Sequence, residues 1–127
     1  MKARLATDLL TDILTEAEYA VAFVGEMNRE ALDLDPRTIR AVVRCFEIIG
    51  EAARLIPQDV RDRASAIPCQ RMIGMRNRLA HDYIHTDIDI LLSTTKHDLP
   101  PLIDAIRHLR VSLLSQMGSS TSGPTQS

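Results

Sequence analysis

The 127-residue sequence has few aromatic residues and no tryptophan: Phe, Trp and Tyr together make up only 3% of it. A core must therefore be built mainly from Leu, Ile, Val, Ala and Met, a set that suits packed helices better than a β-sandwich. Long apolar runs are also absent, and none approaches the roughly 18 residues of a membrane-spanning helix. Hydrophobic residues at 45% and charged residues at 25% nevertheless match an ordinary globular domain and disfavour global disorder.

Cysteine and net positive charge are scarce as well. The two cysteines, Cys45 and Cys69, form neither a CxxC motif nor a disulfide framework, and Asp8 and Asp12 interrupt any signal-peptide core near the N-terminus. We therefore expect a reduced, soluble protein of the cytoplasm. The formal net charge is −2, which argues against a non-specific nucleic-acid coat because affinity for phosphate depends on an excess of Lys and Arg. The net charge does not exclude a small basic cleft on a protein that is otherwise close to neutral.

Apolar residues recur at steps of three and four along most of the chain, the spacing of amphipathic helices. With no strand-like alternation and no internal repeat, the pattern predicts an all-α fold, an up-and-down bundle of four to five helices. Asp35 is placed to cap the second long helix and Pro36 to open it. A short helical piece is expected from about Asp59 to Ala64, and Pro68 is placed to start the next helix.

Several single residues carry further expectations. Gly50 falls inside the second long helix, where glycine costs about 1 kcal/mol relative to alanine, so it predicts close packing against another helix. Thr86 is expected to cap a later helix, and Pro100 and Pro101 to mark a kink or a restart. The tail, residues 118–127, has no large apolar side chain, so we expect it to be disordered and residues 1–117 to form the one folded domain.

The segment RNRLAHDYIH, residues 76–85, concentrates ionisable groups and admits three interpretations. In the first, His81 and His85 lie four residues apart like the ligands of a zinc-binding HExxH helix. An aspartate stands in place of the glutamate, however, and neither of the only other histidines, His97 and His108, has a zincin-like context. In the second interpretation, the segment is an ordinary charged helix face whose side chains form solvated ion pairs worth about 0–1 kcal/mol each. The residue spacing by itself favours this interpretation.

The third interpretation is an RNA-cleaving site, which needs an arginine and a histidine at one phosphate. Arg76 and His81 are about 140° apart around an ideal helix and roughly 7.5 Å apart along it, so one helix does not aim both at a single point. A bend near His81, or a second copy across a dimer axis, could bring the groups together. The acid-free stretch from Arg63 to His81 also contains Arg71, Arg76 and Arg78, a plausible anion-binding patch.

RNRLAHDY resembles the R-x4-H-x-Y pattern of HepT-like HEPN proteins, with Arg76, His81 and Tyr83 in the three fixed places. The similarity extends over most of the chain in the order AVVRCFEIIGEAARLIP (41–57), IPCQRMIGMRNRLAHDY (67–83) and HDLPPLIDAI (97–106). One departure is Cys69, where the family usually has tryptophan; we expect it to alter packing rather than chemistry.

The resemblance implies a HEPN-like helical-bundle homodimer, with the R-x4-H motifs of the two chains meeting in a cleft. It also implies metal-independent endoribonuclease activity against RNA. Such proteins are typically the toxin of a toxin–antitoxin pair. The usual partner is a minimal nucleotidyltransferase antitoxin, which transfers AMP to the motif tyrosine, here Tyr83. Arg76 and His81 are then the expected catalytic residues, with Asn77 and Arg78 positioning the substrate. We expect no metal or other cofactor in this chain, since Mg²⁺ and ATP would belong to the antitoxin.

The expected chemistry fits these residue types. A histidine with a pKa near ~6.5 can take the proton of a ribose 2′-OH at neutral pH, and an arginine can hold the phosphate through two hydrogen bonds. Glu47 and Glu51 are placed to pair with Arg76, or are ordinary surface carboxylates, and Asn77 equally fits a plain surface amide. The alternative function is a catalytically weak HEPN module that serves as a nucleotidyltransferase- or nucleotide-binding scaffold.

Overall fold

The computed structural model of the protein describes residues 2–65, 67–82 and 87–125, and the side chains of 5–65, 67–79 and 87–118. Every regular element in this part of the chain is helical, which confirms the predicted all-α bundle. The four long helices are α1 (Lys2–Val24), α3 (Pro36–Leu55), α5 (Cys69–Asp82) and α7 (Leu99–Thr125). Short helices lie between them: α2 (Arg29–Asp33), α4 (Gln58–Arg63), α6 (Ile88–Ser93) and the π-helical segment η2 (Thr94–Asp98).

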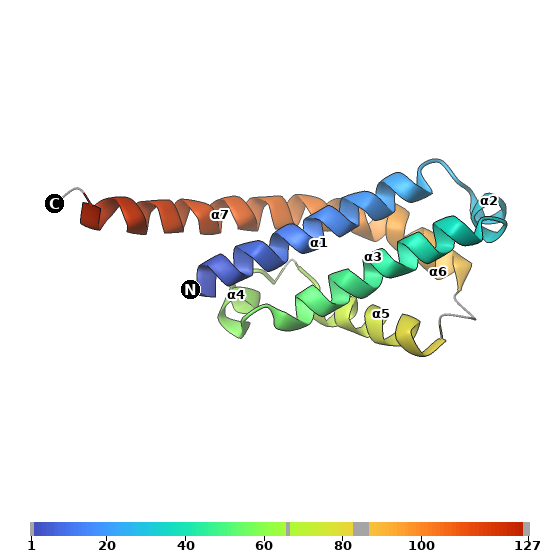
Figure 1. Ribbon diagram of the computed structural model, residues 1–127, viewed down its shortest axis with the longest axis horizontal. Helices are drawn as coiled ribbons and strands as arrows, with labels where there is room; N and C mark the ends of the chain where they lie inside the picture. The colour runs from blue at the N-terminus through green and yellow to red at the C-terminus, as the bar shows by residue number, and fades with distance from the viewer. Residues whose placement is uncertain (1, 66, 83–86, 126–127) are drawn as a thin grey trace.

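The long helices lie side by side in the order α7, α1, α3, α5 (Figure 1). The apolar faces of α1 and α3 meet in the middle of this row, where Leu10, Ile13, Val42 and Ile49 are almost completely buried. α1 also packs against α7, whereas α3 is the only helix with which α5 makes broad contact among the described residues. Much of the surface of α5, the helix that carries the arginine-rich motif, is therefore left for other contacts.

Local sequence signals set most of the helix ends. The carboxylate of Asp35 accepts a hydrogen bond from the Thr38 amide at 3.0 Å, and Pro36 takes the first helical position of α3, as predicted. α5 begins directly after Pro68, also as predicted. The predicted Thr86 cap is wrong: Asp87 caps α6 and accepts from two backbone amides at 2.9 and 3.2 Å, while Thr86 itself lies outside the described residues.

η2 joins α6 to α7 without a break in the chain's helical course. Pro100 and Pro101 fall in the first turn of α7, so the predicted restart is confirmed. Since proline has no amide hydrogen, the carbonyl groups one turn earlier lose their α-helical donors, and the π-helical turn lies at that point. α7 continues as helix past residue 117, and the division into a domain and a disordered tail stays a prediction. Within the described residues, no helix has both the length and the apolarity to cross a membrane.

Candidate active site

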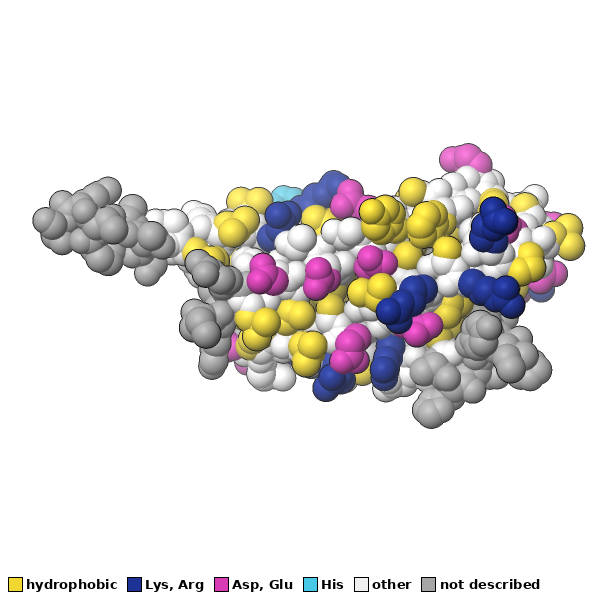
Figure 2. Space-filling view, in the orientation of Figure 1, with side chains coloured by type: hydrophobic (Ala, Val, Ile, Leu, Met, Phe, Trp, Pro, Cys, Tyr) yellow, Lys and Arg dark blue, Asp and Glu magenta, His cyan; other side chains and the backbone are white. Residues whose placement is uncertain are grey.

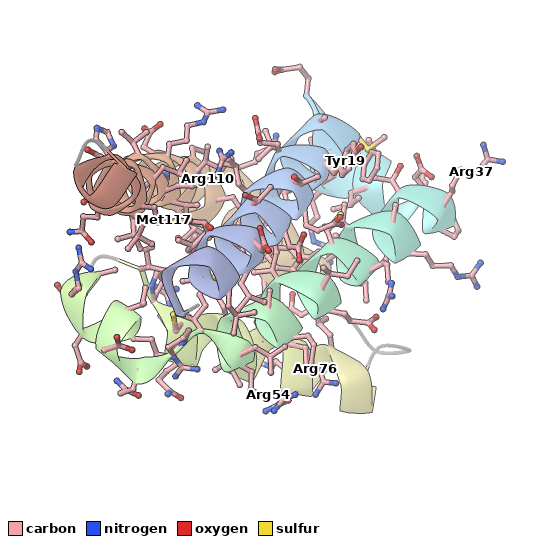
Figure 3. All side chains as sticks on the ribbon, turned by 60° about the vertical axis from the view of Figure 1, so that its left-hand side comes forward. Tyr19, Arg37, Arg54, Arg76, Arg110 and Met117 are labelled. Atoms are coloured by element: carbon pink, nitrogen blue, oxygen red, sulfur yellow. The ribbon has the colours of Figure 1, made fainter. Side chains whose placement is uncertain are left out.

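Arg76 is positioned by the closest approach of α3 and α5. A Cβ atom added to Gly50 would overlap the Cβ of Arg76 and come within 2.8 Å of the Met72 carbonyl oxygen. Only a glycine therefore lets the two helices meet at this point, which confirms that Gly50 marks close helix packing. The stem of Arg76 starts inside this contact, and its guanidinium extends toward the edge of the bundle (Figure 3).

The guanidinium of Arg76 has two polar neighbours. Its Nη1 donates to the Asn77 side-chain oxygen at 3.1 Å, and its Nη2 lies 3.7 Å from a Glu51 carboxylate oxygen. Of the two acids placed to pair with Arg76, Glu51 is thus confirmed, whereas Glu47 lies 3.6 Å from Arg44 instead. The Arg76 side chain remains 39% exposed, so a phosphate group can reach it from solvent.

Arg54 and Arg76 lie near each other at this edge of the bundle (Figure 3), and both pair with Glu51. Arg54, one turn later in α3, donates to its carboxylate at 2.6 Å. That hydrogen bond, followed by the charges of Arg54 and Arg76, lowers the pKa of Glu51. Glu51 is therefore ionised at neutral pH, and its stronger contact is with Arg54. Because the Arg76–Glu51 contact is long and open to water, it is weakly held.

A cleft of about 260 Å³ opens beside Arg76, between α1, α3 and α5. Its charged lining consists of Arg44 and Arg76 together with Asp12, Glu47 and Glu51. The carboxylates outnumber the guanidinium groups, so the cleft of a single chain is acidic overall. Basic and acidic side chains are also interspersed over the coloured part of the face seen in Figure 2, without a continuous cationic surface.

The four arginines that the sequence suggested as one anion-binding patch are divided by the fold. Arg76 faces the cleft beside α3, whereas Arg71 and Arg78 line a second pocket, of about 490 Å³, on another side of α5. Arg71 lies 3.2 Å from Asp98, and Arg63 donates to a glutamine of α7 at 3.1 Å. Among the described side chains, those of 5–65, 67–79 and 87–118, Arg78 has no ionic partner.

Two of the predicted site residues lie partly or wholly outside the described structure. Position 81 is the penultimate residue of α5, but the His81 side chain and the whole of Tyr83 lie outside the described residues. Their catalytic and modification roles stay predictions. The zinc interpretation needs His81 and His85, and so falls outside as well; the described residues contain no cluster of three or more metal-ligating side chains.

The two cysteines are structural. Both are free thiols buried in the core, Cys69 directly at the start of α5. Burial raises the pKa of the Cys69 thiol and raises that of Cys45 to about 12. A buried thiol that stays protonated is a poor nucleophile, so neither is a candidate for the chemistry of the site.

Comparison with models of known protein families matches residues 13–109 to the family described as "Ribonuclease HepT-like". The chain belongs to the HepT-like ribonuclease family. The matched residues include all of α3 and α5, and thus Gly50, Glu51 and Arg76. Membership supports a ribonuclease activity and agrees with the all-α bundle.

Curated relatives of the chain carry names that match this family. The chain is 38% identical over 103 residues to a probable ribonuclease HepT of Thermococcus cleftensis, across 81% of this chain and 94% of the relative. A candidate RNase of Methanocaldococcus jannaschii is 34% identical over 93 residues, across 73% and 80% of the two chains. A candidate RNase of Caldanaerobacter subterraneus subsp. tengcongensis is 33% identical over 100 residues, across 79% and 89%. No solved structure gave a significant match.

Proposed function

We propose that this chain is a metal-independent endoribonuclease, the toxin of a HEPN/nucleotidyltransferase toxin–antitoxin system acting in the cytoplasm. The observation that carries the proposal is the placement of Arg76. In a chain of the HepT-like ribonuclease family, its guanidinium stands half-exposed at the mouth of a cleft, fixed at its base by Gly50. An accessible guanidinium on a side chain anchored at its base is suited to stabilising the negative charge that develops in phosphoryl transfer.

The proposed reaction uses the RNA's own nucleophile. His81 removes the proton of the ribose 2′-OH, the 2′ oxygen attacks the neighbouring phosphorus, and the bond from phosphorus to the 5′ oxygen breaks. A protonated group delivers a proton to the departing oxygen, leaving a 2′,3′-cyclic phosphate and a 5′-hydroxyl. Arg76 binds the phosphate through two hydrogen bonds as its charge grows.

A homodimer would supply what one chain lacks. Position 81 follows Arg76 by five residues on the same helix, a spacing that places the two positions about 140° apart. A second α5 across a dimer axis would bring a histidine toward each arginine and provide both a base and an acid. It would also bring additional arginines to a cleft that is acidic in the single chain.

Asn77 and Arg78 are proposed to position the substrate. The Asn77 side chain accepts from Arg76 and so limits the directions in which the guanidinium can swing. Arg78, exposed and without an ionic partner among the described residues, would contact a phosphate next to the one that is cleaved. Both residues follow Arg76 on α5, so the three move as one rigid unit.

We propose Tyr83 as the residue that a cognate minimal nucleotidyltransferase antitoxin modifies with AMP. Tyr83 comes two residues after His81, and an attached phosphate would add negative charge and bulk next to the catalytic group. That charge would repel RNA. The Mg²⁺ and ATP that the transfer needs would be bound by the antitoxin, the second partner of this chain after RNA.

The decisive experiment measures RNA cleavage in EDTA by the wild-type protein and by Arg76→Ala and His81→Ala. Alanine keeps the Cβ that contacts Gly50, so Arg76→Ala should fold normally and lose about 10²- to 10³-fold in rate. Arg54→Ala is the matched control, because it removes an arginine from the same Glu51 without touching α5. We expect it to cleave at close to the wild-type rate.

One observation favours a second candidate, a catalytically weak scaffold that binds the nucleotidyltransferase or a nucleotide. The carboxylates of Asp12, Glu47 and Glu51 around Arg76 disfavour an incoming phosphate, whether of RNA or of a nucleotide, and so favour the scaffold that binds the nucleotidyltransferase. An unmodified wild-type dimer that fails to cleave any RNA would select this candidate. Equal cleavage by wild type and Arg76→Ala would instead remove Arg76 from the mechanism.

A further inference from the structure

A second cavity, separate from the cleft beside Arg76, lies between α3, α5 and the continuous α6–η2–α7 segment. Its volume of about 490 Å³ falls within the range of sites that hold small ligands. Its walls are largely apolar, formed by Phe46, Ile49, Pro68, Met72, Met75, Ile90, Leu99 and Leu102. Its polar lining is provided by Arg71, Arg78, Thr94 and Asp98.

Gly74 keeps this pocket open. A Cβ atom added to Gly74 would meet nothing within 4 Å, in contrast to Gly50, where the same atom collides with α5. Gly74 is therefore not required for the packing of its own helix. Its missing side chain leaves room in the pocket, and this room lies on the side of α5 that has no broad contact with another helix among the described residues.

The polar groups of the lining come from two facing elements. Arg71 and Arg78 are two turns apart on α5, and Asp98 and Thr94 lie opposite them on η2. Asp98 holds Arg71 at 3.2 Å, both side chains being well exposed, while Arg78 has no ionic partner in the described part of the chain. Short π-helical turns occur frequently at functional sites, and here the turn supplies both polar groups that face the arginines.

We propose that this pocket receives one unstacked base of the RNA substrate, with Arg71 and Arg78 contacting the phosphates on either side of it. Apolar walls suit the flat face of a base, and the Asp98 carboxylate suits an amino group on its edge. The inference rests on the proposed ribonuclease function. Positions 74, 78 and 81 share one side of α5 by their spacing, so the base in the pocket belongs to a nucleotide near His81, on the side of α5 away from Arg76.

The test couples a change in the pocket to a change in the RNA. Gly74→Leu adds a side chain to the cavity at a position where an added Cβ would meet nothing within 4 Å, and Gly118→Leu is the matched control at another helical glycine with the same property. The probes are 2′-O-methyl RNA oligonucleotides, which cannot be cleaved, each with one abasic nucleotide at a different position. Affinity is measured by fluorescence anisotropy at fixed salt.

In the wild-type protein and in Gly118→Leu, one abasic position should weaken binding by up to about 5- to 150-fold, the range for a base stacked on an aromatic side chain, which Phe46 provides in this lining. Gly74→Leu should bind the intact RNA more weakly by a similar factor and should show no further loss at that position. Gly74→Ala fills less of the cavity and should give an intermediate loss, which guards against a misfolded leucine variant.

Equal abasic penalties in the wild-type protein and in Gly74→Leu would overturn the inference. So would a Gly74→Leu protein that binds RNA normally but dissociates to monomers in light scattering, since the occupant would then be a second copy of the chain. Cleavage of unmodified RNA by the same proteins separates this inference from the proposed function. If Gly74→Leu removes the abasic penalty but no protein cleaves RNA, the base pocket is retained and the nuclease function is rejected. If the proteins cleave RNA but Gly74→Leu leaves the abasic penalty unchanged, the nuclease function is retained and the base pocket is rejected.

Discussion

Replacing Gly50 with alanine would force apart the two helices that meet at Arg76. The new Cβ would strike the Cβ of Arg76 and approach the Met72 carbonyl oxygen to 2.8 Å, and neither atom can swing away as the end of a long side chain could. Overpacking of this kind costs about 1–3 kcal/mol, whereas alanine recovers about 1 kcal/mol of helix propensity. Because the obstructing atoms are rigid, we expect a net destabilisation of about 1–2 kcal/mol.

Urea denaturation followed by circular dichroism measures this change, with Gly74→Ala as the matched control. The control makes the same exchange on the other helix of the contact, where the new Cβ meets nothing within 4 Å. It should therefore stabilise the protein by up to about 1 kcal/mol. Two identical exchanges on neighbouring helices are thus expected to shift the free energy of unfolding in opposite directions.

The same variants connect packing to activity. If Gly50→Ala displaces Arg76 by about 1 Å, cleavage should fall by about 10²-fold, since misplacement on that scale removes productive alignment. A Gly50→Ala protein as stable as wild type would show that α3 and α5 can separate at a cost no greater than the roughly 1 kcal/mol of helix propensity that alanine recovers. It would refute the conclusion that this contact fixes the position of Arg76.

Three further predictions concern the helix ends and the core. Asp35→Ala should lower the urea midpoint at pH 7, because it removes the side chain that caps α3 at the Thr38 amide. The cap lowers the pKa of Asp35, so its stabilisation is complete above the ordinary value of 3.8 and is lost as the pH falls through the lower native pKa. The difference in urea midpoint between wild type and variant should therefore disappear in acid. A constant gap would contradict this. Arg61→Met should lower the free energy of unfolding by about 1–2 kcal/mol, because the Arg61 guanidinium donates to three carbonyl groups at the end of α3. An unchanged urea midpoint would show that Arg61 does not stabilise this helix end. Cys45 and Cys69 should react slowly with a thiol reagent at pH 8 until urea unfolds the chain, since burial raises both pKa values, and rapid labelling of the native protein would contradict their burial.

Much of the fold is determined by signals that act over a few residues, and these could be predicted. Asp35 and Pro36 start α3 through a cap and a fixed backbone angle, and Gly50 marked a close helix contact because a glycine there is otherwise unfavourable. The Asp87 cap was missed because Thr86 and Asp87 are both suitable caps and adjacent in sequence. The π-helical turn before Pro100 was missed because it depends on how the chain compensates for two absent amides.

The candidate site was predictable in composition but not in arrangement. The sequence placed Glu47 and Glu51 either as partners of Arg76 or as ordinary surface carboxylates, and only the packed structure assigns Glu51 to Arg76 and Glu47 to Arg44. The arginines around Arg76 are close in sequence, but their angular positions on α5 send Arg71 and Arg78 to a different side. Sequence spacing alone gave no sign of the pocket there, because its opposite wall comes from η2, far along the chain.

The carboxylates paired with the arginines of α5 act as built-in counter-ions. Glu51 lies against Arg76 and Asp98 against Arg71, while Arg78 has no such partner in the described part of the chain. A phosphate that displaces a carboxylate leaves a negative charge that recaptures a dissolved cation, so little net ion release accompanies that contact. If three phosphates are contacted, the logarithm of affinity would then fall with the logarithm of salt concentration with a slope nearer to about −0.7 than to about −2. A tenfold rise in salt concentration would then weaken RNA binding about fivefold rather than about a hundredfold.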